Sequence, residues 1–276
     1  QSQTITVEDV TDPVLACVPA DLSIECDEIP VAASPTASDN CDTDVQIGFV
    51  ETTTAGPCPQ DYTLVRTWTA TDNCGNSISE TQNIFIFDNS VPEFANIPAD
   101  ITINCEDSLP TDEPTVTDNC GVTTMTLDTQ TTPGECPQES IVTKTWTAED
   151  DCGNSIEAVQ VITIVDIEDP ILVNVPADVT IECDAAMPTD TPSATDNCDT
   201  NVEVSYTEIQ SGGSCAESYT LIRTWTATDN CGNEVEGVQQ ITVEDNESPV
   251  MIGVPADITV ECNDIPSPAQ PTATDN

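Results

Sequence analysis

One stretch of the sequence decides the fold, RTWTATDNCGN at residues 66–76. It returns with small changes as KTWTAEDDCGN at residues 144–154 and unchanged at residues 223–233. The three tryptophans, Trp68, Trp146 and Trp225, are therefore 78 and 79 residues apart. Self-similarity at a fixed period is typical of tandem domain arrays. We expect each domain to be about 79 residues long.

Two further markers repeat in the same register. A Pro-Ala-Asp segment followed by an alternating run and a cysteine occurs four times, and Asp-Asn-Cys follows it three times. These markers predict three complete repeats, called repeat 1, repeat 2 and repeat 3, at residues 10–88, 89–166 and 167–245. We expect residues 1–9 to be the last strand of a preceding repeat and residues 246–276 to be the N-terminal part of a fourth. The chain is then a piece of a longer array.

The composition excludes several classes of function. The 276 residues include 51 Asp and Glu, 3 Lys and Arg and no His, which gives a formal net charge of −48. Such a surface repels nucleic acid and anionic lipid, and no apolar run approaches the roughly 18–20 residues that span a bilayer. Most of these carboxylates are expected to form a solvated, self-repelling face. We predict no nucleic-acid partner and no membrane insertion in this segment.

The cysteines and the repetition argue against an enzyme. The chain has 14 Cys and no Cys-x-x-Cys pair, which favours disulfides and an extracellular or cell-surface location. Catalytic sites are usually singular, whereas every candidate feature here recurs in each repeat. We therefore predict no catalytic residues.

Short Thr/Val/Ile-rich runs separated by Pro, Asp, Asn and Gly predict an all-β fold. In repeat 3 the strands are expected near residues 178–183, 192–196, 202–209, 218–228 and 234–244. Several short strands at regular spacing are typical of a β-sandwich. No stretch shows the helical period of 3.6 residues.

These residues carry a family resemblance. The Asp-Asn-Cys turn, the RTWTATDNCGN strand and turn and the closing Ile-Thr-Val-x-Asp resemble the hyalin-repeat (HYR-like) module. They are most similar to its tandem, cysteine-bearing version in giant surface adhesins of gliding and other Bacteroidota. The resemblance covers the whole chain and implies tandem immunoglobulin-like β-sandwiches in an adhesive surface protein.

With an immunoglobulin-like strand order, alternate connections lie at the same end of the sandwich. Two of the four cysteines of a repeat would then lie at one end and two at the other, and each pair could form a disulfide. The predicted bridges are Cys26–Cys58, Cys41–Cys74, Cys105–Cys136, Cys120–Cys152, Cys183–Cys215 and Cys198–Cys231. Neighbour pairing, such as Cys26–Cys41 with Cys58–Cys74, stays open. Cys17 and Cys262 are expected to be unpaired within these residues, and Cys17 is either a free thiol or bonded elsewhere.

Carboxylates gather at the same turns and in the linkers between repeats. Converging oxygen donors without histidine or thiolate are what Ca²⁺ needs, with six to eight oxygens at about 2.3–2.6 Å. The alternative is that these residues only form side-chain-to-backbone turns. The predicted structural calcium ligands are Asp9, Asp12, Asp39, Asp72, Asp88, Asp118, Asp150, Asp166, Asp169, Asp196, Asp229 and Asp245.

The sequence thus predicts a structural or adhesive stalk of a large extracellular protein, stapled by disulfides and stiffened by calcium. Its partners would be the neighbouring repeats, and beyond them other copies or a surface glycan or protein. The alternative is that each repeat is itself a glycan- or protein-binding module. Exposed tryptophans at positions 68, 146 and 225 would favour that alternative, because glycan sites commonly use aromatic platforms.

Overall fold

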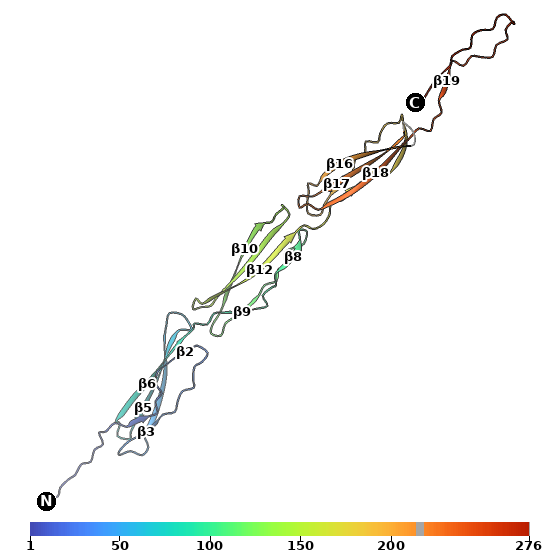
Figure 1. Ribbon diagram of the computed structural model, residues 1–276. Coiled ribbons are helices and arrows are strands. Elements are labelled where there is room, and N and C mark those ends of the chain that lie inside the picture. Colours follow the sequence, from blue (N-terminus) through green and yellow to red (C-terminus); the bar gives the residue numbers. More distant parts are fainter. Residues whose placement is uncertain (214–217, 276) are drawn as a thin grey trace. The chain divides into compact units, whose positions relative to one another are not determined.

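Repeat 1 forms a sandwich of two β-sheets, as shown by the computed structural model, which describes residues 1–213 and 218–275 (Figure 1). The larger sheet has the strand order β2-β6-β5-β4, with β2 parallel to β6 and the other pairs antiparallel. A small antiparallel pair, β1 with β3, forms the second sheet. The strands are β1 (Val14–Ala16), β2 (Leu22–Glu25), β3 (Thr36–Ser38), β4 (Gln46–Ala55), β5 (Tyr62–Thr71) and β6 (Ser77–Phe87).

Repeats 2 and 3 have the same two sheets. Their larger sheets have the orders β10-β11-β12-β8 and β14-β18-β17-β16, and their small sheets are β7-β9 and β13-β15. The strands of repeat 2 are β7 (Glu93–Ala95), β8 (Ile101–Asn104), β9 (Thr115–Thr117), β10 (Thr124–Pro133), β11 (Ser140–Glu149) and β12 (Ser155–Val165). Those of repeat 3 are β13 (Ile171–Val173), β14 (Val179–Glu182), β15 (Ser193–Thr195), β16 (Glu203–Gly212), β17 (Tyr219–Thr228) and β18 (Glu234–Glu244). Beyond them β19 (Val250–Ile252) pairs with β20 (Thr272–Thr274).

The central strand of each larger sheet supplies the core. Alternate residues of β5 point inward, and Trp68 and Ala70 pack with Leu15 of β1. Trp68, Trp146 and Trp225 are only 2%, 0% and 2% exposed. Burying one large aromatic per repeat contributes much of the limited apolar area that these short strands offer. Each tryptophan therefore faces the core of its repeat.

The expected all-β, tandem-sandwich fold is confirmed, with two differences in detail. A sixth strand, β13, pairs with β15, because three residues suffice to close the small sheet. Residues 1–9, expected to be the last strand of a preceding repeat, form no strand, since a strand requires a hydrogen-bonded neighbour and no described segment pairs with them. No described segment is a helix that could cross a membrane.

One turn position with a left-handed backbone carries different residues in the different repeats. Cys17, Asn96, Asn174 and Gly253 occupy equivalent places, and all have a positive φ, of 66°, 57°, 61° and 77°. Asn and Gly tolerate this left-handed conformation well, whereas other residues adopt it at a cost of about 1–2 kcal/mol. Cys17 is exposed at this turn.

The three cations have structural roles inside the sandwiches. Arg66 donates to the carboxylate of Glu51 and to the Pro30 carbonyl, and Arg223 does the same with Glu208 and the Pro188 carbonyl. Lys144 donates to the Pro110 carbonyl. Each cation therefore ties the larger sheet to the loop that precedes the small sheet's second strand.

The chain divides into two compact units. Gln1–Ile101, Leu109–Thr131 and Val142–Ile162 form the first, and Thr102–Ser108, Thr132–Ile141 and Thr163–Asn276 form the second. The junction between repeats 1 and 2 thus lies within the first unit, and the junction between repeats 2 and 3 lies within the second.

A truncation in the core of repeat 3 tests its packing. Ile241 is fully buried against Leu221 and Val243, so we expect Ile241→Ala to lower the free energy of unfolding of this repeat by about 2–5 kcal/mol. The control is Ile209→Ala on β16, where the side chain is 67% exposed and the effect should stay within about 0.5 kcal/mol. Denaturant unfolding measures both, and similar losses at the two positions would contradict this core.

Candidate functional site

Each repeat ends its penultimate strand in the same tight turn. After β17, Asp229 Oδ1 accepts hydrogen bonds from the backbone N–H of Cys231 at 2.8 Å and of Asn233 at 2.9 Å. Gly232 takes a φ of 91°, which a side chain would disfavour. Asp72 and Asp150 form equivalent turns. The turn therefore points one aspartate and one asparagine at the linker that precedes the repeat.

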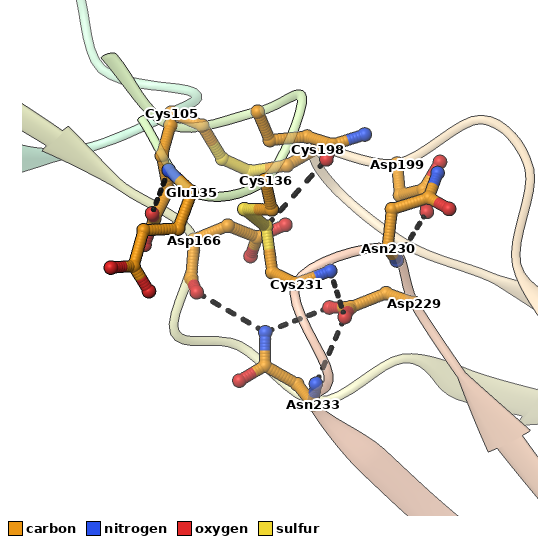
Figure 2. The surroundings of a disulfide bond; sticks show 12 residues. Cys105, Glu135, Cys136, Asp166, Cys198, Asp199, Asp229, Asn230, Cys231 and Asn233 are labelled. Atoms are coloured by element: carbon orange, nitrogen blue, oxygen red, sulfur yellow. Dashed lines mark hydrogen bonds between the residues drawn. A yellow bond between two sulfur atoms is a disulfide. The ribbon is translucent and has the colours of Figure 1, made fainter. Parts of the chain in front are cut away.

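The asparagine of this turn holds the linker. Asn233 Nδ2 donates to Asp229 Oδ2 at 2.7 Å and to the backbone oxygen of Asp166 at 3.2 Å, as Figure 2 shows. Asn154 makes the same pair of bonds to Asp150 and to the Asp88 backbone, and Asn76 makes them to Asp72 and to the Asp9 backbone. The last residue of one segment is thus fixed over the turn of the next repeat.

A second turn completes the site. Asp196 Oδ1 accepts hydrogen bonds from the backbone N–H groups of Cys198 and Asp199, both at 2.8 Å. Asp199 is buried, and its Oδ2 accepts a hydrogen bond from the Asn230 N–H at 2.9 Å, which ties the two turns together. Asp42 does the same with Asn73 in repeat 1. Asp42 and Asp199 were not predicted from the sequence as part of the site, although an acid directly after Asp-Asn-Cys in repeats 1 and 3 could have indicated them.

Two linker aspartates, Asp88 and Asp166, are buried with carboxylate oxygens that lack a hydrogen-bond partner among the described residues. Asp166 is 4% exposed, and neither of its carboxylate oxygens accepts a hydrogen bond among the described residues. Asp88 is 5% exposed and has one such oxygen, Oδ2. A buried charged oxygen without a partner is costly, because burial removes its hydration. These oxygens therefore need a cation or a proton.

The pKa values of the junction aspartates reflect their burial and mutual repulsion. Burial, followed by repulsion from Asp196, Asp229 and Asp199, raises the pKa of Asp166. Burial also raises the pKa of Asp88, with further repulsion from Asp118, Asp150 and Glu25. Asp229 behaves in the opposite way: burial alone would raise its pKa, but hydrogen bonds from the side chain and backbone of Asn233 and from Cys231 and Gly232 lower it.

The structure gathers most of the predicted calcium ligands. Carboxylate oxygens of Asp9, Asp39 and Asp72 lie within 4.8 Å of one another. The equivalent sets at the two junctions are Asp88, Asp118 and Asp150, and Asp166, Asp196 and Asp229, with Asp88 and Asp118 oxygens also within 4.8 Å. Asp12 and Asp169 are instead exposed in the linkers, and Asp245 accepts a hydrogen bond from the Glu247 N–H.

The disulfides cross the junctions between repeats. Cys26–Cys120 and Cys58–Cys152 join repeat 1 to repeat 2, with Cα–Cα distances of 5.8 and 5.1 Å. Cys105–Cys198 and Cys136–Cys231 join repeat 2 to repeat 3, with distances of 5.9 and 5.1 Å (Figure 2). Sequence separations of 94, 94, 93 and 95 residues show one rule for all four.

The predicted pairing within repeats is therefore wrong. Cys26–Cys58, Cys41–Cys74, Cys105–Cys136, Cys120–Cys152 and Cys198–Cys231 do not form, and neither does the neighbour pairing of Cys26 with Cys41 and Cys58 with Cys74. For Cys183–Cys215, Cys215 lies outside the described residues. The reason is geometric: the two cysteines at one end of a repeat face the next repeat, whose own pair lies within bonding distance across the junction.

Three exposed cysteines of repeat 1 are free. Cys17, Cys41 and Cys74 carry thiols, and so does Cys262, as expected for Cys17 and Cys262. Cys41 and Cys74 occupy the positions at which repeats 2 and 3 are bonded to the repeat before them. The Asp9 carboxylate raises the pKa of the Cys41 thiol most strongly, whereas burial and then Asp9 raise that of Cys74. Both thiols are therefore mainly protonated at neutral pH.

Comparison with known families gives one clear match. The model of the HYR-like domain with 4 cysteines matches residues 94–164 and 171–243, in two tandem copies. No curated protein matches the sequence.

Solved structures similar to the chain include cadherin ectodomains. The protocadherin GammaB4 extracellular domain is 14% identical with a TM-score of 0.36, covering 94% of this chain, which spans only 53% of that protein. Drosophila N-cadherin EC1-4 is 14% identical with a TM-score of 0.30, covering 86% of this chain and 77% of its own. Human CDH23 EC21-23 is 19% identical with a TM-score of 0.31, covering 84% and 100%.

Peptide mapping tests the bridges. Digestion of the non-reduced protein should release linked peptides containing Cys26 with Cys120, Cys58 with Cys152, Cys105 with Cys198 and Cys136 with Cys231. Before reduction, a maleimide should label Cys17, Cys41 and Cys74, because all three are exposed thiols. Recovery of Cys41 linked to Cys74 would contradict this arrangement.

The raised pKa of Asp166 gives a pH dependence. The folded chain holds this proton more tightly than the unfolded chain, so ionisation of Asp166 lowers stability as the pH rises from its ordinary pKa of 3.8 through the raised value. In chelator, the melting temperature of Asp166→Asn should therefore equal that of the wild type below about pH 3.8. At higher pH it should exceed the wild-type melting temperature by an amount that grows as the pH rises. The exposed Asp169→Asn is the control, with a small difference at every pH. A constant or reversed difference for Asp166→Asn would disprove the assignment.

Proposed function

Because the chain belongs to the family of HYR-like domains with four cysteines, we propose that it is a stalk or fibre segment of a large extracellular surface adhesin. The chain is a tandem array of extracellular-type, immunoglobulin-like repeats with disulfides, and modules of this kind are typically adhesive and non-enzymatic. The proposed setting is the cell surface of a gliding or related bacterium of the Bacteroidota type. There the array would hold a binding tip away from the cell.

The observation that carries this proposal is the covalent joining of neighbours. Every bridge between described cysteines connects one repeat to the next, so the bridges serve the array rather than the single domain. A binding module would instead gain from bridges that shape its own loops. The formal net charge of −48 would keep a long fibre soluble and separate from other fibres.

The alternative, a glycan- or protein-binding role for each repeat, is less well supported. Trp68, Trp146 and Trp225 are buried, so these residues offer no aromatic platform. A shallow pocket in repeat 3 is lined by Tyr206, Arg223 and Trp225, but the hydroxyl of Tyr206 and the guanidinium of Arg223 are both bonded to Glu208. Their polar groups are thus already engaged within the fold.

We further propose that calcium binds at the junctions. Asp166, Asp196 and Asp229 supply oxygen donors, and the two unpartnered oxygens of Asp166 fit a hard cation. Asp88, Asp118 and Asp150 would act in the same way at the other junction, and Asp9, Asp39 and Asp72 before repeat 1. A divalent cation would replace the repulsion among these carboxylates by shared coordination. It would thereby fix the angle between neighbouring repeats.

Substitution of one carboxylate tests the calcium proposal. In chelator, Asp166→Asn should raise the melting temperature by about 2–4 °C, the shift that ~1 kcal/mol produces in a protein of this size, because it removes an uncompensated charge. In millimolar calcium the wild type should gain stability, and Asp166→Asn should lose most of that gain. Calorimetry should show correspondingly weaker calcium binding.

The matched control is Asp169→Asn, which removes the same charge three residues away on the exposed linker. It should leave both the calcium response and the melting temperature in chelator nearly unchanged. Small-angle scattering of the wild type with calcium and with chelator follows the junctions directly. Equal maximum dimensions and equal melting temperatures under the two conditions would contradict the calcium proposal. These aspartates would then only form turns.

A further inference from the structure

The bridges give repeat 2 an unusual covalent connectivity. Cys120 and Cys152 bond it to repeat 1, whereas Cys105 and Cys136 bond it to repeat 3. A pull on the chain ends can therefore pass through repeat 2 without following its backbone from the first strand to the last. The route with the fewest residues enters at Cys120 and leaves at Cys136.

We infer that tension along the array is carried through repeat 2 by the single edge strand β10 between these two disulfides, so that the repeat cannot be unravelled by a pull. The inference rests on the proposed stalk function, because only a stalk has to transmit force between its ends. The path crosses Cys26–Cys120, follows residues 120–136 and crosses Cys136–Cys231. The second pair of bridges offers a longer path around the same core.

The residue numbers show how much of the backbone the bridges exclude from the force-bearing path. Residues 26 and 231 are separated by 205 positions along the backbone, but positions 120 and 136 differ by only 16. Ten residues of that segment, Thr124–Pro133, already form β10. A strand rises about 3.3 Å per residue, close to the maximum of about 3.3–3.6 Å for a stretched chain. The direct path therefore has little slack.

The position of β10 in its sheet favours this role. It is the edge strand of the order β10-β11-β12-β8, and among the described strands it pairs with β11 alone. Both of its ends would be pulled along the same strand, so the force acts on covalent bonds rather than shearing β10 from β11. Without the bridges, the force would enter at β7 and leave at β12, and would have to strip these strands from their sheets.

Force spectroscopy of the full chain, held at its two ends, tests the inference. At high force the oxidised chain should reach a contour of about 30 nm, because only residues 1–26, 120–136 and 231–276 remain in the path at ~3.5 Å per residue. The fully reduced chain should reach about 96 nm on the same scale. Pairing within repeats would instead give about 62 nm.

Four double variants separate β10 from the other path, and each removes one disulfide. Cys26→Ser with Cys120→Ser, and Cys136→Ser with Cys231→Ser, break the direct path and should lengthen the contour to about 41 nm. The matched controls, Cys58→Ser with Cys152→Ser and Cys105→Ser with Cys198→Ser, leave β10 bridged at both ends and should keep about 30 nm. Non-reducing peptide mapping of each sample verifies the remaining bridges.

An oxidised wild-type chain that stretches to about 62 or 96 nm would overturn the inference, and so would equal contours for all four variants. The lengths are measured on single molecules without calcium, so they do not depend on the junction carboxylates. A missing calcium response in the scattering experiment would remove the calcium proposal and leave these lengths unchanged. The two failures are therefore distinguishable.

Discussion

The disulfides between neighbouring repeats are the constraint on which the rest of the structure depends. A domain of about 79 residues with one buried tryptophan has a small core and is usually stapled internally. Here the disulfides between described cysteines link neighbouring repeats instead, as in Cys26–Cys120 and Cys105–Cys198. A bridge that closes a loop of 93–95 residues restricts the unfolded chain strongly, by about 4–5 kcal/mol in the chain-entropy model. Stability therefore belongs to pairs of repeats more than to one repeat.

The same bridges explain why buried carboxylates are tolerated at the junction of repeats 2 and 3. The sulfur atoms of Cys105 and Cys198 and a carboxylate oxygen of Asp166 lie within 4.8 Å of one another. The covalent bond thus holds Asp166 beside the turn of Asp196, although the two carboxylates repel each other. Asn233 donates a hydrogen bond to the backbone oxygen of Asp166, whereas the side-chain oxygens of Asp166 stay without a partner among the described residues. The proposed cation site would therefore be pre-organised, since binding would not have to bring its carboxylates together.

The sequence was sufficient for the fold and for most of the acidic site, because both follow from local patterns. Alternation around Trp68 predicted the central strand, and the Asp-Asn-Cys turns placed the aspartates at the ends of the repeats. The cysteine pairing could not be predicted in this way. The two ends of a repeat were separated correctly, but only the structure shows that Cys26 lies opposite Cys120 of the next repeat rather than beside a bonded Cys58. The three-residue strand β13 was missed because so short a run has no readable alternation.

The two junctions also show which of their parts are free to vary. Both have two disulfides, a carboxylate set and an asparagine that holds the linker, yet the position after Asp-Asn-Cys is Asp199 in repeat 3 and Gly121 in repeat 2. Asp199 ties two turns together through Asn230. At Gly121 a Cβ would lie 2.9 Å from Nε2 of Gln60, so the glycine leaves room for a side chain of the preceding repeat. The bridges and carboxylates are thus the shared chemistry, and the surrounding contacts can differ because the covalent bonds already fix the approach of the two repeats.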